Sequence, residues 1–359
     1  MQRKKVHSVY PEIGEEETQA VLEVMKTTMV TQLEQTLLFE EEISRYIGCK
    51  YTIVLNSGTS ALITALWAHG IMPNDVVAVP SYTYIATVNA ITAVGAIPKF
   101  MDCAKDTFNV DLPFSPEIFP EKSSIAPEVY PPSRHTKAAV IVDVAGMPCD
   151  LDVWNKYCKE HDLILIEDAC EAFGAQYKDR KVGNDDHTVV FSFNITKQLQ
   201  TIEGGAICTN DPTIDERVKL IRRQGQDLDL VVKTGEYHHT AFGLNFRTTD
   251  IQSAIGRVQL RKIDKFLTYR REIAEAYRYG IADAFNSSSP TTIEWQEVPE
   301  YVQRHPFFMC LMVCETEQLR DKILNYLRSK GIQVRICWKP VHLQPVYSFG
   351  PYAGAILLS

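Results

Sequence analysis

Apolar runs of strand length alternate with amphipathic segments through the first half of the chain. Short runs of branched and aromatic side chains, bounded by turn residues, predict the strands. These runs are residues 51–55, 76–79, 97–101, 138–144, 163–167 and 189–193. Apolar positions at helical spacing predict helices over residues 60–69, 86–94 and 153–161. Such alternation is typical of an α/β fold, in which helices cover both faces of a mostly parallel sheet.

The pattern changes after about residue 255, where regular strand and helix alternation ends. The elements predicted beyond this point are a charged helix over 257–284, an apolar strand over 307–313, a helix over 317–330 and a strand over 333–337. We therefore expect a large domain over residues 1–255 and a small C-terminal domain over residues 256–359.

One stretch of the first half fits neither helix nor strand. Residues 112–135 hold six of the 18 prolines of the chain. Proline lacks a backbone N–H and disrupts both helices and interior strands. We expect a surface insertion, with a subunit contact or a loop that gates substrate access as the alternative.

Composition excludes several classes of protein. The net charge of -8 gives no basic surface for nucleic acid. No apolar run approaches the roughly 18 residues that span a membrane, and no apolar region follows the basic start at Arg3 to act as a signal peptide. The nine cysteines form no Cys-x-x-Cys pair, so we expect reduced thiols, no metal site and a cytoplasmic location.

Two chemically active side chains follow predicted strands of the sheet. Asp168 ends the run 163–167, and Lys197 lies just beyond the run 189–193. The carboxyl ends of parallel strands meet at one edge of a sheet, where ligands of α/β proteins bind. A carboxylate and an amine at one such edge are the groups that a pyridoxal phosphate enzyme requires.

Five sequence elements occur together with this pair. They are SGT-x-AL at residues 57–62, P-S-x-T-Y-x-AT at 80–87, EDA-x-x-A-x-GA at 167–175, FSF-x-x-x-K at 191–197 and G-x-N-x-R at 243–247. In this order the chain resembles the DegT/DnrJ/EryC1/StrS family of sugar aminotransferases from about residue 14 to about residue 347. The resemblance implies a fold-type I pyridoxal phosphate-dependent transferase, like aspartate aminotransferase, with a mostly parallel central sheet and a small C-terminal α+β domain.

The resemblance also implies catalytic roles for Lys197 and Asp168. Lys197 would form the imine with pyridoxal 5'-phosphate and then shuttle protons. Asp168 would keep the ring nitrogen protonated. A surface lysine and an aspartate that caps a helix are the purely structural alternatives.

The remaining cofactor contacts come from three other segments. The cofactor phosphate would lie on the turn at Ser57, Gly58 and Thr59, because backbone amides at a helix N-terminus bind anions. An ordinary capping turn is the alternative. Ser192 would add a hydroxyl to the same phosphate, and Tyr84 would stack on the ring.

Two further expectations concern the ring contact and the subunit interface. Tyr82 competes with Tyr84 for the place on the ring. Asn245 and Arg247 belong to a loop that in the family reaches the partner's cofactor phosphate, which implies a homodimer with shared active sites. A turn asparagine is the alternative for Asn245.

The chain departs from the family pattern in several places. Glu171 stands where the family often has Gln or His near the phenolic oxygen of the cofactor, so it is either protonated or turned toward the substrate amine. The segment 28–33 lacks the usual glycines, and Thr31 within it is a candidate substrate contact. His342 is another, unless it is merely solvated. Family members usually continue beyond Ser359, and the sequence does not decide whether the chain is complete.

These features predict transamination of a keto-sugar, specifically a nucleotide-linked 4-keto-6-deoxy sugar, with L-glutamate or L-glutamine as amino donor, in the biosynthesis of amino sugars and surface polysaccharides. Glu171 favours amination at C4, because some 4-amino-sugar synthases of the family carry Glu there. The alternatives are a non-nucleotide ketone such as a cyclitol, an aminoshikimate-type ring or a keto-sugar acid, a dehydratase, and a catalytically silent regulator.

Overall fold

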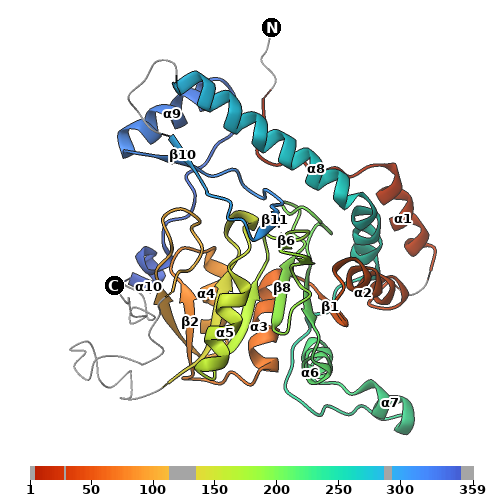
Figure 1. Cartoon of the computed structure of the whole chain (residues 1–359). Coiled ribbons are helices and arrows are strands. Elements are labelled where there is room, and N and C mark those ends of the chain that lie inside the picture. The colour runs from red at the N-terminus through yellow and green to blue at the C-terminus, as the bar shows by residue number, and fades with distance from the viewer. Residues whose placement is uncertain (1–4, 28–29, 113–134, 287–292, 349–359) are drawn as a thin grey trace.

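A seven-stranded sheet forms the centre of the protein (Figure 1). The computed structural model describes residues 5–27, 30–112, 135–286 and 293–348. The sheet has the order β1-β9-β8-β5-β4-β2-β3, and β9 runs antiparallel to the other six strands. The strands are β1 (Tyr51–Leu55), β2 (Val76–Pro80), β3 (Ile97–Met101), β4 (Thr136–Val142), β5 (Ile164–Asp168), β8 (Thr188–Ser192) and β9 (Gly205–Thr209). The predicted mostly parallel α/β fold is confirmed.

Helices cover both faces of this sheet because its strands bury side chains on both sides. One core cluster joins the sheet to three helices, α3 (Gly58–Ala68), α4 (Ile85–Ala93) and α6 (Pro212–Arg222). The other cluster joins it to α2 (Glu34–Ile47), α5 (Leu151–Glu160) and the first half of α8 (Asp250–Asn286). Neighbours on β5 show the alternation, since Leu165 belongs to one cluster and Ile166 to the other.

The long helix α8 links the central sheet to the C-terminal elements (Figure 1). The helix α1 (Glu15–Met25) packs on it through Glu17, whose buried carboxylate lies 2.8 Å from Lys262 Nζ. At its start, the carboxylate of Asp250 accepts hydrogen bonds from the backbone N–H groups of Leu33 and Thr36. The division into domains at residue 255 stays a prediction, and α8 spans this position.

The remaining described elements lie outside the seven-stranded sheet. They are β6 (Gln176–Tyr177), β7 (Arg180–Lys181), β10 (Ile293–Trp295), β11 (Val302–Arg304), β12 (Met312–Cys314), α7 (Leu228–Thr234), α9 (Glu317–Ser329), α10 (Pro345–Ser348) and the 3-10 turns η1 (Val144–Gly146) and η2 (Val341–Leu343). Within the described residues, no helix combines the length and the apolar character needed to cross a membrane.

Two predicted strands of the C-terminal part are largely wrong. In the run 307–313 only the end belongs to a strand, β12. The start of this run forms hydrogen bonds outside any sheet, because Phe308 N–H donates to Ala145 O and Phe307 O accepts from Arg270. The run 333–337 forms no strand, and Gln333 N–H donates to Val6 O near the N-terminus. The Pro-rich insertion falls almost wholly on residues 113–134, outside the described residues.

An arm between α6 and α8 projects from the body of the protein (Figure 1). The arm, residues 226–242, includes α7 and carries large apolar side chains that face solvent. Val232 is 87% exposed, Tyr237 81% and Phe242 72%.

Candidate active site

The predicted site residues gather at the carboxyl edge of the sheet. Asp168 ends β5, and Lys197 lies in the loop that follows the neighbouring strand β8. Ser57 follows β1 and begins α3. Parallel strands of one sheet end at the same edge, so the order of strands alone brings these three side chains into one region.

Asp168 is buried, and two donors orient its carboxylate. Thr87 Oγ1 donates to Oδ2 at 2.7 Å, and the backbone N–H of Cys170 donates to Oδ1 at 3.1 Å. The chain turns after Asp168 without entering a helix, so the alternative of a helix cap is wrong. Sequence reasoning missed Thr87, although it closes the same motif that contains Tyr84.

Lys197 is not a surface lysine, because only 13% of its side chain is exposed. Its Nζ lies 3.7 Å from Oε1 of Glu171 and 4.1 Å from the centre of the Phe308 ring. The neighbouring Gln198 donates to the backbone carbonyl of Glu171 at 2.6 Å, which ties the lysine loop to the turn after β5. Sequence reasoning missed Phe308, since it lay within the run wrongly predicted as a strand.

Glu171 has two buried oxygens with different partners. One faces Lys197, and the other accepts the backbone N–H of Ala145 at 2.9 Å. Ala145 supplies this bond from a left-handed conformation, with φ of 61°. Burial raises the pKa of Glu171 to about 7, although Lys197 and the N–H of Ala145 both lower it. Near neutral pH both protonation states of this carboxyl are therefore populated.

The turn at the start of α3 has the form of an anion site. Ser57 caps the helix by accepting the N–H of Ser60 at 3.1 Å. A Cβ on Gly58 would lie 2.8 Å from Cβ of Ser192, so the structure brings this turn and the end of β8 together. A Cβ on Gly205 would lie 2.5 Å from the carbonyl carbon of Ser57. Both glycines are needed for this close approach, and Thr59 is exposed beside them.

The two candidate tyrosines differ in their surroundings. Tyr82 is half-buried, with its ring 5.8 Å from that of Phe108 and 5.6 Å from that of Trp338. Tyr84 precedes α4, is 59% exposed, and its ring lies 6.3 Å from that of Trp338. Tyr84 therefore has more ring surface open to a ligand than Tyr82.

The loop of Asn245 and Arg247 lies beside the helix turn. Asn56 donates from its backbone N–H to Phe246 O at 2.9 Å and from its side chain to Asn245 O at 3.4 Å. The Arg247 guanidinium donates to the Asn245 side chain at 3.1 Å. Asn245 itself is exposed. The structure thus places this loop next to the residue that precedes Ser57.

The two remaining candidates lie at the margin of the region. His342 forms a short hydrogen bond with the Ser81 hydroxyl, three residues before Tyr84, and burial lowers the pKa of its imidazole. Thr31 is exposed in the loop before α2, and that loop is held by Asp250 at the start of α8.

The groups that meet at this edge fit one cofactor. The amine of Lys197 suits an aldehyde, the oriented carboxylate of Asp168 suits a protonated ring nitrogen, and the glycine-lined helix start suits a phosphate. Pyridoxal phosphate contains all three. Sheet and site together define the class of fold-type I pyridoxal phosphate-dependent transferases.

Comparison with known proteins identifies the family. The chain belongs to the DegT/DnrJ/EryC1/StrS aminotransferase family, whose model matches residues 11–354. It is therefore an aminotransferase that uses pyridoxal phosphate, which confirms the resemblance. A GDP-perosamine synthase of Caulobacter vibrioides is 34% identical over 94% of this chain and 85% of the relative.

Two solved structures show the same architecture. Helicobacter pylori PseC, an aminotransferase involved in the biosynthesis of pseudoaminic acid, matches with a TM-score of 0.81 and 29% identity, over 99% of this chain and 90% of that one. The PLP form of Spr1654, a putative sugar aminotransferase of Streptococcus pneumoniae, matches with a TM-score of 0.81 and 25% identity, over 96% of this chain and 88% of that one.

Proposed function

We propose that the protein transfers an amino group from L-glutamate or L-glutamine to the ketone of a nucleotide-linked 4-keto-6-deoxy sugar. The observation that carries the proposal is the Lys197–Glu171 pair at 3.7 Å, in a chain that matches the DegT/DnrJ/EryC1/StrS aminotransferase family. The relative named GDP-perosamine synthase acts, by its name, in making a nucleotide-linked amino sugar. We propose that the aminated sugar is used in amino-sugar and surface polysaccharide biosynthesis.

In this proposal two side chains handle the protons. Pyridoxal phosphate, when bound, supplies the aldehyde and the electron-accepting ring. The Lys197 amine moves a proton to and from the carbon that carries the amino group, and Glu171 exchanges a proton with that amine, since its pKa lies near neutrality. Phe308 packs against the amine and excludes water. Asp168, oriented by Thr87, keeps the ring nitrogen protonated.

The other predicted residues bind and orient the small molecules. Ser57, Gly58, Thr59 and Ser192 hold the phosphate, and Tyr84 lies against the ring. We assign the sugar side of the site to four residues, Thr31, Glu171, Arg247 and His342.

We propose a homodimer in which Asn245 helps to complete the partner's cofactor site. Support comes from the exposed apolar side chains of the arm, because large apolar groups on a projecting segment usually pack against a second chain. We also propose a cytoplasmic location, since all nine cysteines are free thiols.

The test follows nitrogen from donor to acceptor. Purified protein with pyridoxal phosphate is given ¹⁵N-labelled L-glutamate, and the absorption of the bound cofactor is recorded before a nucleotide-linked 4-keto-6-deoxy sugar is added. We expect the yellow absorption to bleach with the donor, to return with the acceptor, and ¹⁵N to appear in the sugar by mass spectrometry. Lys197→Ala should abolish both changes, whereas Lys156→Ala, an exposed lysine on α5, should leave them intact.

Each contrary result would overturn a different part of the proposal. Bleaching without transfer to the sugar, together with transfer to a cyclitol, an aminoshikimate-type ring or a keto-sugar acid, would replace the proposed acceptor. Equal bleaching in Lys197→Ala would remove Lys197 from the reaction.

A further inference from the structure

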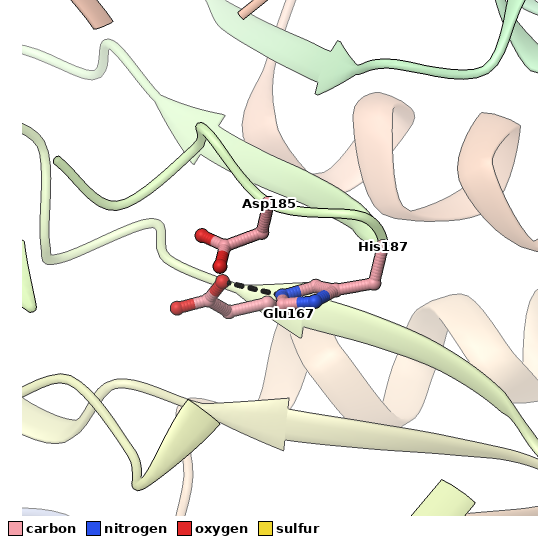
Figure 2. A group of neighbouring side chains, drawn as sticks. All are labelled: Glu167, Asp185 and His187. Carbon is pink, nitrogen blue, oxygen red and sulfur yellow. Dashed lines mark hydrogen bonds and ion pairs between the residues drawn. The ribbon is translucent and has the colours of Figure 1, made fainter. Parts of the chain in front are cut away.

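A second cluster of ionisable side chains lies on the opposite side of β5 from the cofactor site. Glu167, Asp185 and His187 converge there (Figure 2). Glu167 precedes Asp168 in the strand, and its side chain takes the other face because alternate residues of a strand point in opposite directions. Asp185 and His187 come from the turn that leads into the neighbouring strand β8.

These three side chains are almost completely removed from solvent. Glu167 is 0% exposed, Asp185 5% and His187 7%. One possible ligand atom from each residue lies within 4.8 Å of the other two. Burial of ionised groups is costly unless opposite charge or hydrogen bonds compensate it, so a buried convergence of this kind needs a compensating partner.

The histidine is held in the orientation of a metal ligand. Its Nδ1 lies 3.1 Å from the side-chain oxygen of Asn155, and the amide nitrogen of Asn155 donates to Leu151 O at 2.8 Å, which fixes the direction of that amide. An amide oxygen only accepts, so Nδ1 carries the hydrogen. In the neutral ring Nε2 is then an unprotonated nitrogen, and it faces Glu167 Oε2 at 2.8 Å. Metal-binding histidines are oriented by a hydrogen bond of this type.

Asp185 has an unused carboxyl oxygen. Within the described part of the chain, its Oδ2 is buried without a hydrogen-bond partner, whereas Glu167 and the adjacent Asp143 bond to each other through their side chains. The guanidinium of Arg180 compensates one charge, through a bond of 2.8 Å to Asp185 Oδ1. A divalent cation would bind the carboxyl oxygens and the imidazole nitrogen of the cluster that Arg180 does not contact.

We propose that Glu167, Asp185 and His187 bind one divalent transition-metal cation through two carboxylate oxygens and the imidazole Nε2. Oxygen and imidazole ligands without thiolate suit Zn²⁺ and Mn²⁺. Metal–ligand bonds of about 2.0–2.2 Å place neighbouring ligand atoms roughly 3 Å apart, close to the separation of the Glu167 and His187 atoms. Sequence spacing gave no sign of this site, because its ligands come from separate segments.

The cation has a positioning role in this arrangement. It joins the end of β5, which carries Asp168, to the start of β8, whose far end leads to Lys197. Its loss should therefore loosen the two strands that present the catalytic pair, without removing any group that touches the substrate.

The test measures metal bound by the full-length protein. The chain is unfolded in chelator, refolded with Mn²⁺ or Zn²⁺, freed of excess ion and assayed for metal per chain. Mn²⁺ is the main probe because it binds thiols poorly and thus avoids the free cysteines. We expect about one Mn²⁺ per wild-type chain, a thermal midpoint that rises with the metal, and a directly coordinated imidazole nitrogen in pulsed electron paramagnetic resonance.

Conservative variants locate the ion. Glu167→Gln and His187→Gln should bind Mn²⁺ at least about tenfold more weakly, and Asp185→Asn serves if either fails to fold. His69→Gln is the matched control, since His69 is half-buried and bonds to Thr188 beside the cluster without joining it. This variant should bind the ion normally. If wild-type protein binds neither ion, the proposal is overturned. Protons, and not a metal ion, then neutralise the buried carboxyl groups. Binding that survives in all the cluster variants would overturn it equally.

Discussion

The ionisation of Glu171 makes stability depend on pH in a direction that the structure fixes. The pKa of this carboxyl is about 7 in the folded protein, against 4.5 for the ordinary group. Between these values the folded chain holds a proton that the unfolded chain has released. Stability therefore falls as pH rises through this window, because the unfolded state binds fewer protons. Below about pH 4.5 the ionisation of Glu171 costs no stability, and above about pH 7 the loss of stability is complete.

The size of the effect follows from the pKa difference. A difference of about 2.5 units corresponds to about 3.4 kcal/mol, at 1.36 kcal/mol per unit, and about 2.5 kcal/mol of it develops between about pH 5 and about pH 8. Only 7% of the Glu171 side chain is exposed, so solvent does not screen this charge. Glu171→Gln removes the titration. At about pH 5 the variant should have a lower free energy of unfolding than wild type. By about pH 8 this difference should have moved by about 2.5 kcal/mol in favour of the variant.

Urea unfolding of the cofactor-free protein, at one protein concentration and a series of pH values, measures this change. Loss of the partner of Lys197 adds an offset to the variant, but that offset is constant over the window and cancels in the pH difference. Glu160→Gln, at an exposed position on α5, should follow the wild-type profile. Parallel pH profiles for wild type and Glu171→Gln would refute the reasoning, because they would show that Glu171 titrates equally in both states.

Three further predictions concern contacts around the site and one control position. Thr87→Val removes a donor to the Asp168 carboxylate and should weaken pyridoxal phosphate binding about tenfold in a fluorescence titration, whereas Thr87→Ser should restore it. Gly58→Ala places a Cβ 2.8 Å from Ser192 Cβ and should weaken cofactor binding more than about tenfold; unchanged affinity would remove the helix turn from the phosphate site. Gly280→Ala, in the exposed part of α8 with no atom within 4 Å of the added Cβ, should leave binding unchanged and raise stability by about 0.5–1 kcal/mol in thermal unfolding.

Local pattern was enough for most of the large domain. The strands β1 and β3 have the predicted bounds, and the other predicted strands of the sheet differ by one or two residues at their ends. Period and turn residues decide such elements, since a buried strand must be apolar on both faces. The same information placed Asp168 and Lys197 at one edge, because strand direction alone brings the carboxyl ends together.

Local pattern failed where the backbone had distant partners. The run 307–313 has the composition of a strand, yet the backbone hydrogen bonds of Phe307 and Phe308 go to α8 and η1. The antiparallel strand β9 was likewise not predicted. Pairing in a sheet depends on which chain segments meet, and a run of apolar residues does not specify its partner.

The sequence by itself determined six of the seven strands of the central sheet, the family motifs and the identity of the reactive amine and carboxylate. Only the tertiary structure decided what surrounds them. Thr87 reaches Asp168 from a separate helix, and Phe308 reaches Lys197 from the C-terminal part. The protonation of Glu171 depends on the same packing, because a pKa near 7 results from desolvation, which no residue has until the chain around it is folded.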